Sequence, residues 1–229
     1  MNQSVLLAKP KEITWGWRYL AFQFFFLEYF LGFAVRFFEI PCTALQLNLV
    51  YFCINLTATL VIFHRFLAES WKAALDRIIP ILAAAGVGCA AYYFLSILVS
   101  SFIITVHPGF ANVNDRSIAA IAQQHHVLAA IGTVLLVPTA EELLHRGAVF
   151  GGLYRKNRIA AYAVSTVIFA LVHISGYIGY HSPFILLLCF LQYIPAGICL
   201  AASYEYSGNI VTPILIHTAV TAVGMLAMR

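Results

Sequence analysis

The sequence predicts an all-α protein, a polytopic bundle of transmembrane helices, and two observations carry the prediction. Of its 229 residues, 62% are hydrophobic and 10% are charged, whereas about a quarter of a typical soluble domain is charged. Apolar stretches recur along the whole chain, several of them reaching the roughly 20 residues that cross a bilayer. We therefore expect a single integral membrane domain over residues 1–229, without a separate soluble module.

Seven apolar stretches have the length and composition of a membrane span. They cover residues 14–36, 44–66, 78–106, 126–153, 159–179, 183–204 and 209–228. Arg18 and Glu28 interrupt the first, which can therefore be partly interfacial, and the third is long enough to tilt. One re-entrant piece would raise the count to eight. The stretch from 107 to 124 is the only sizeable polar connection, and we expect it to lie outside the cytoplasm.

The basic residues favour one orientation. With a cytoplasmic N-terminus, the cytoplasmic loops carry Lys9, Lys11, Arg65, Lys72, Arg77, Arg155, Lys156 and Arg158, and the opposite side has little more than Arg36, Arg116 and Arg229. This asymmetry is what the positive-inside rule describes. The modest net charge of +4 is spread over loops, which indicates a lipid bilayer as partner and no nucleic acid. We expect a multi-pass protein of a bacterial cytoplasmic (plasma) membrane.

One short segment, PTAEELLHRG at residues 138–147, places four ionisable side chains within an apolar span. A charge at the bilayer centre costs about 2.5–3.5 kcal/mol, so these groups must pair or line a wet cavity. Glu142 and Arg146 are four residues apart, the spacing of an intrahelical ion pair. Glu141 lies about 100° around the helix from Glu142 and is free for chemistry, while His145 shares its face as a partner or as a polar lining residue. A purely structural ion pair is the alternative.

Pro138 and Thr139 open the same segment. Proline removes a backbone hydrogen bond, and Thr139 with Glu142 has the spacing of a capping box. We therefore predict that the helix breaks and restarts here.

Two further histidines stand at a comparable depth. Glu141 and His173 are each 14 or 15 residues from the basic loop RKNR at residues 155–158, or about 21 Å at 1.5 Å per residue. His217 enters the membrane from the same side, about 8 residues past Asn209. A lone histidine at this depth is usually a packed core residue, but three such groups at one level predict a functional site.

Three segments resemble one family of membrane proteins. EELLHR at 141–146 looks like an EExxxR motif, FALVH at 169–173 like an FxxxH motif, and SGNIVTPILIHTAVT at 207–221 like the last motif of the CPBP intramembrane proteases. This group includes the type II CAAX prenyl endopeptidases and bacterial proteins called Abi. The resemblance covers about residues 120–228, the expected catalytic core.

The resemblance implies an intramembrane endopeptidase that hydrolyses peptide bonds of hydrophobic or lipid-modified peptides, which we place near the cytoplasmic leaflet. It implies that Glu141 activates a water, that His173 positions it and that His217 stabilises the oxyanion. Glu142 and Arg146 would organise the site, and Phe169 would pack its catalytic face. The family usually has Asn or Asp four residues after the last histidine, where this sequence has Thr221.

Two alternatives remain open at this level. Zinc could be held by His173, His217 and either Glu141 or Glu142, giving a metal-dependent protease; the resemblance favours a glutamate mechanism without a cofactor. The same buried Glu and His groups could instead serve a lapsed membrane binding protein or an ion- or proton-coupled transporter. Against transport, the sequence shows no duplicated halves of the inverted-repeat kind.

Overall fold

The structure is a computed structural model that describes residues 5–228. In that range every regular element is a helix, and one isolated bridge joins Ile178 and His181. The elements in order are α1 Pro10–Phe22, the π-helical η1 Gln23–Leu27, α2 Glu28–Phe37, α3 Ala44–Leu75, α4 Ile78–Val106, α5 Val113–Ala130, η2 Ile131–Leu136, α6 Val137–Glu142, η3 Leu143–Phe150, α7 Gly151–Tyr154, α8 Arg158–Ser175, α9 Pro183–Ser207 and α10 Val211–Ala227.

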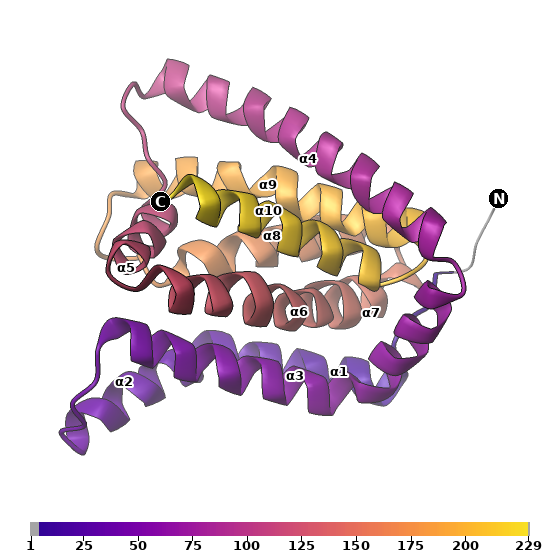
Figure 1. The fold of residues 1–229 in the computed structure, drawn as a ribbon, viewed down its shortest axis with the longest axis horizontal. Helices are drawn as coiled ribbons and strands as arrows, with labels where there is room; N and C mark the ends of the chain where they lie inside the picture. Colours follow the sequence, from indigo (N-terminus) through magenta and orange to yellow (C-terminus); the bar gives the residue numbers. More distant parts are fainter. Residues whose placement is uncertain (1–4, 229) are drawn as a thin grey trace.

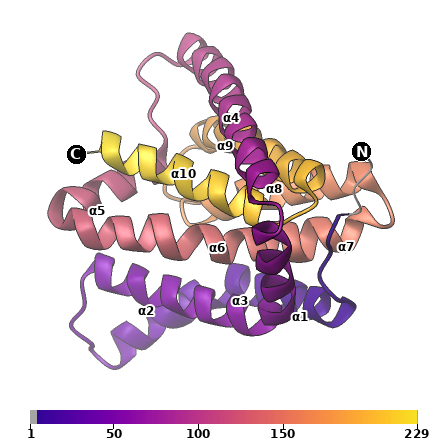
Figure 2. The same cartoon turned by 45° about the vertical axis from the view of Figure 1, so that its right-hand side comes forward.

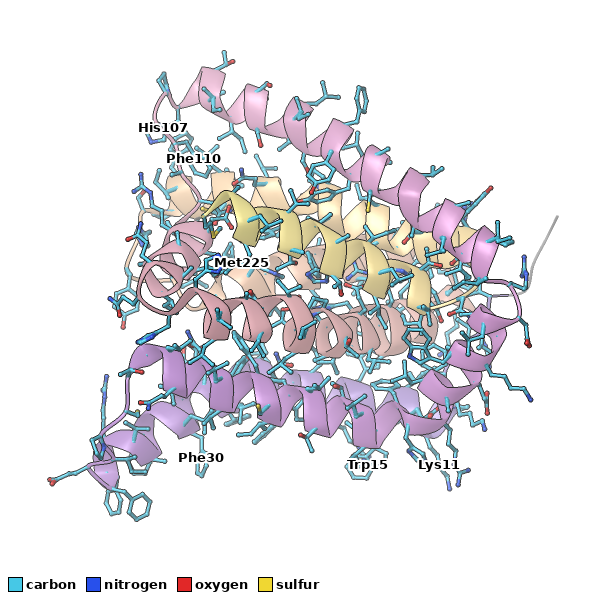
Figure 3. The ribbon with its side chains drawn as sticks, viewed as in Figure 1. Lys11, Trp15, Phe30, His107, Phe110 and Met225 are labelled. Atoms are coloured by element: carbon cyan, nitrogen blue, oxygen red, sulfur yellow. The ribbon has the colours of Figure 1, made fainter. Side chains whose placement is uncertain are left out.

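These elements join into seven rods, because no loop separates α1 from α2 or α5 from α7, although α5 is kinked at His125. Six rods are long and apolar enough to cross a membrane, and α10, with 17 residues, is shorter. Large apolar side chains face outward along them, such as Trp15 and Phe30, which point away from the bundle in Figure 3. The predicted all-α multi-pass bundle is confirmed.

Two helices extend beyond the apolar stretches that mark the predicted spans. Part of the polar connection 107–124 is helical, since α5 begins at Val113 after Asn112, whose side chain accepts a hydrogen bond from the Asn114 N–H. The second span continues as helix to Leu75, because charged residues end an apolar stretch without ending a helix. Hydropathy marks where a span can leave the membrane, and capping side chains decide where a helix ends.

The sequence-based prediction that the helix breaks at Pro138 was wrong. The rod runs through Pro138, and the Thr139 side chain caps nothing. Instead π-helical turns lie on both sides, and the Val137 N–H reaches back to the carbonyl of Gly132. A π-turn inserts an extra residue into the helix, which absorbs the missing proline N–H without a break. Such turns occur often at functional sites.

Figures 1 and 2 show three groups of helices around the α5–α7 rod. Helices α1 to α3 lie on one side, α8, α9 and α10 lie on the other, and α4 crosses obliquely over α9 and α10. Helices α8 and α9 approach closely where Gly197 faces Thr166. Glycine has no Cβ, and a Cβ added at Gly197 would lie 2.6 Å from Thr166 Cγ2, which is too close for a larger residue.

The end of the bundle that carries the basic loops is sealed. The Leu6 N–H donates to the carbonyl of Gly208 at 2.9 Å, and the Tyr204 hydroxyl donates to the carbonyl of Leu6. Glu205 on α9 accepts hydrogen bonds from Tyr154, Tyr162 and Arg158. The opposite end, with the α2–α3, α4–α5 and α8–α9 connections and the last turn of α10, lies on the left of Figure 1.

Candidate active site

A fully buried ion pair organises the centre of the molecule. Arg146 Nη1 donates to Glu142 Oε1 at 3.0 Å, and both side chains are 0% exposed. Arg146 Nη2 donates to the carbonyl of Gly197 on α9 at 3.1 Å, so the guanidinium joins the α5–α7 rod to α9. The geometry agrees with the pairing expected from the four-residue spacing.

The Glu141 side chain is not part of this ion pair and faces two histidines. Its Oε2 lies 3.7 Å from His173 Nε2 and 3.9 Å from His217 Nε2, and the three side chains are between 12% and 15% exposed. Helices α6, α8 and α10 each supply one of them. The structure therefore brings together the three residues that the motifs marked.

Hydrogen bonds fix how the two imidazoles are turned. His173 Nδ1 lies 2.8 Å from the carbonyl of Phe169, and His217 Nδ1 lies 2.9 Å from Glu142 Oε1. Both partners are acceptors, so each Nδ1 carries the proton and each Nε2 is turned to Glu141. Glu142 thus holds Arg146 and His217 at once, a second role that the sequence did not reveal.

Aromatic rings clamp His173 between two helices. Its ring lies 4.5 Å from the ring of Phe169 and 4.3 Å from that of Tyr193 on α9. Phe169 also lies beneath the Arg146 guanidinium, at 4.8 Å, and beside His217. Phe169 therefore contacts His173, His217 and Arg146 at once.

Tyr193 was missed by sequence reasoning. Its hydroxyl accepts from Asn114 Nδ2 at 3.0 Å and donates to Asn112 Oδ1 at 3.4 Å, which ties His173 to the start of α5. Helix α9 is apolar almost all round, so periodicity could not single out one of its aromatic residues. Only the tertiary contact with His173 reveals it.

The remaining candidates lie at the margin of the site. His145 is buried and does not line the cavity; its Nδ1 bonds to the backbone carbonyl of Glu141 at 2.8 Å, and its ring packs edge-on against Phe169. The Thr221 hydroxyl donates to the carbonyl of His217 at 2.9 Å, in its own helix. Threonine commonly bonds back in this way, and here the bond turns the hydroxyl proton away from the reacting groups.

A cavity of about 570 Å3 connects Glu141, His173 and His217 to the outside. Its lining runs from Leu144 and Ile216 at the level of the histidines to Asp115, Tyr177 and Met228. Met225 of α10 faces the same space, toward the α5–α7 rod (Figure 3). The cavity therefore extends toward the end opposite the basic loops.

Between residues 5 and 228, no group of three or more His, Cys, Asp or Glu side chains has the arrangement of a metal site. Of the zinc ligands considered from the sequence, Glu142 is already engaged by Arg146 and His217. His173, His217 and Glu141 are the donors that remain for a cation.

The C-terminal half resembles known proteins. Residues 122–223 match the family model described as type II CAAX prenyl endopeptidase Rce1-like. This chain carries an Rce1-like segment. The match confirms the resemblance drawn from the three motifs, since Glu141, His173 and His217 all lie within the Rce1-like segment.

A curated relative matches the chain at 30% identity over 95 residues, the UPF0177 protein YxdF of Lactococcus lactis subsp. lactis (strain IL1403). The aligned part covers 42% of this chain and 47% of the relative, so the chain spans about half of the relative's length. No solved structure matches the chain.

Proposed function

We propose that the protein is an intramembrane endopeptidase of the CAAX type, which hydrolyses peptide bonds in hydrophobic or lipid-modified peptides. The observation that carries the proposal is the position of the Glu141 carboxylate, within 4 Å of two histidine Nε2 atoms at the inner end of a cavity. The match of residues 122–223 to the Rce1-like model supports the same activity.

In the proposed reaction, Glu141 takes a proton from a water molecule, and the hydroxide attacks the peptide carbonyl carbon. His173 Nε2, whose lone pair faces Glu141 because Nδ1 is bonded to Phe169, accepts the second hydrogen bond of that water and holds it in place. When the C–N bond breaks, protonated Glu141 gives its proton to the leaving amine. A positioned general base typically contributes about 10²–10⁴-fold to the rate.

His217 is the proposed donor to the oxyanion. With Nδ1–H committed to Glu142, it donates through Nε2 only as an imidazolium, for which the Glu142 carboxylate is the charge partner. A preorganised donor of this kind is worth roughly 10²–10³ in rate. Arg146 in turn holds Glu142 in position.

The side of access differs from the one we expected from the sequence. If the basic loops are cytoplasmic, the sealed end of the bundle faces the cytoplasm and the cavity extends toward the other leaflet. We therefore propose that substrates enter from the non-cytoplasmic side of the membrane rather than near the cytoplasmic leaflet.

The test compares peptide N-termini in membranes that contain the wild type with those in membranes that contain Glu141→Gln at equal expression. Termini that disappear with Glu141→Gln support a protease and name its substrates. Identical termini, with both proteins folded, would refute the proposal and favour the lapsed binding protein, for which the inward-bonded Thr221 hydroxyl is the structural argument.

A further inference from the structure

Three carboxylates line the cavity, and two of them, Glu28 and Asp115, take part in no ion pair among the described residues. Glu28, Asp115 and Glu141 all contribute to its wall, and no Lys or Arg is among the described residues that line it. Glu28 and Asp115 are both exposed where the cavity meets the outside, so no cationic side chain of the described protein pairs with the carboxylates at its mouth.

Glu28 occupies a position that is unfavourable for a carboxylate. Its Oε1 and Oε2 lie 3.6 and 3.9 Å from where a Cβ would stand on Gly176, the residue that ends α8. The carboxyl end of a helix carries a partial negative charge, and the last turn of α10, at Met228, lines the same mouth. A carboxylate held against a helix C-terminus costs stability unless something positive joins it.

Asp115 faces the mouth from the first turn of α5, where the helix dipole favours an ionised carboxylate. Asp115 and Glu28 line the same cavity, together with His173 and Tyr177. The two mouth carboxylates therefore flank one opening.

Gln23 adds a buried hydrogen-bond acceptor to the wall of the cavity. Gln23 is 7% exposed and lines the cavity; its Nε2 donates to the Tyr51 hydroxyl at 2.9 Å, while its Oε1 has no hydrogen-bond partner in the described protein. An unsatisfied buried acceptor is costly, and it suits a ligand that brings N–H donors. Gln23 and Tyr51 line the same cavity as Glu28 and Glu141, so this acceptor belongs to the wall shared by the mouth and the proposed catalytic group.

We propose that the mouth formed by Glu28 and Asp115 binds a positively charged segment of the peptide substrate, a Lys or Arg side chain next to its apolar part. The inference rests on the proposed function and adds the substrate class. The cavity, about 570 Å3 and lined in its depth by apolar residues such as Leu200 and Val220, has room for several side chains. That favours a basic, hydrophobic peptide over a bare cation as occupant.

The experiment measures binding rather than cleavage. Two peptides with acetylated N-termini and amidated C-termini share one Leu/Ala-rich sequence and a neutral dye, and differ only in carrying Lys-Lys or Glu-Glu at one end. Their affinity for the full-length protein in dodecylmaltoside is measured by fluorescence anisotropy at 50 and 500 mM NaCl. The double variant combines Glu28→Gln with Asp115→Asn. The matched control is Glu39→Gln, because Glu39 is an exposed carboxylate at the same end of the molecule that does not line the cavity.

The Lys-Lys peptide is expected to bind at least about tenfold more tightly than the Glu-Glu peptide, equal to about 1.4 kcal/mol. The preference should shrink at high salt and fall below about threefold in the double variant, while Glu39→Gln retains it. Equal affinities, no binding of either peptide, or a preference that survives the double variant would overturn the proposal. Repeating the measurement in Glu141→Gln separates it from the proposed function, because charge-selective binding needs no cleavage.

Discussion

Replacing Arg146 with Met tests whether the buried ion pair organises the site. The change removes the guanidinium bonds to Glu142 at 3.0 Å and to the Gly197 carbonyl at 3.1 Å. It leaves Glu142, 0% exposed, with His217 as its one remaining hydrogen-bond partner. Breaking a buried pair from one side costs about 3–5 kcal/mol. At about 2–4 °C per kcal/mol for a chain of this length, the apparent melting temperature should fall by about 6–20 °C.

The assay is thermal unfolding of the detergent-purified protein, with Glu142→Gln and the double variant completing a double-mutant cycle. The double variant, which combines Glu142→Gln with Arg146→Met, removes both charges. Its free energy of unfolding should be higher than that of Arg146→Met alone by about 2 kcal/mol or more. Strictly additive losses, or a fall of under 2 °C for Arg146→Met, would refute the view that the two side chains form one buried unit. Activity should remain low in the double variant, because His217 loses its charged partner.

Three other predictions concern the reacting groups. Tyr193→Leu removes the ring that packs against His173 and should lower kcat by about 10–100-fold, since small misplacements of catalytic groups are costly. Tyr193→Phe keeps the ring and should cause less than half of that loss on a logarithmic scale; equal losses in the two variants would contradict the prediction. Thr221→Asn should preserve or raise the cleavage rate, because the asparagine amide can donate a hydrogen bond to the oxyanion, whereas the threonine hydroxyl donates to the carbonyl of His217 in its own helix. A large drop in the cleavage rate would assign the oxyanion contact to another residue. A strong chelator should leave cleavage unchanged, whereas a loss that zinc restores would favour the metal alternative.

The sequence predicted the helical rods because hydropathy and helix length are local properties. It also predicted the pairing of Glu142 with Arg146, since a spacing of four residues fixes which side chains meet on one helix. It failed at Pro138, where the choice between a break and a π-turn depends on how neighbouring helices hold the backbone. The start of α5 at Val113 was not predicted because residues 107–124 were treated as a polar connection between spans, whereas Asn114 and Asp115 line the cavity.

The meeting of Glu141, His173 and His217 could be anticipated from their depth in three spans. Their mutual orientation could not. The acceptors at each Nδ1, Phe169 and Glu142, and the ring of Tyr193 against His173 depend on the packing of α8, α9 and α10. The end at which the cavity opens likewise follows only from its lining residues in the structure, and it is the basis for the proposal that substrates enter from the non-cytoplasmic side.

The central claim is that Glu141 activates the attacking water. Its most direct test is the single-turnover cleavage rate of Glu141→Gln on a peptide identified from the wild-type termini, with folding checked by thermal unfolding. We predict a rate at least about 10²-fold below that of the wild type, with a melting temperature within a few degrees of the wild-type value. A folded Glu141→Gln protein that cleaves within tenfold of the wild-type rate would contradict the account.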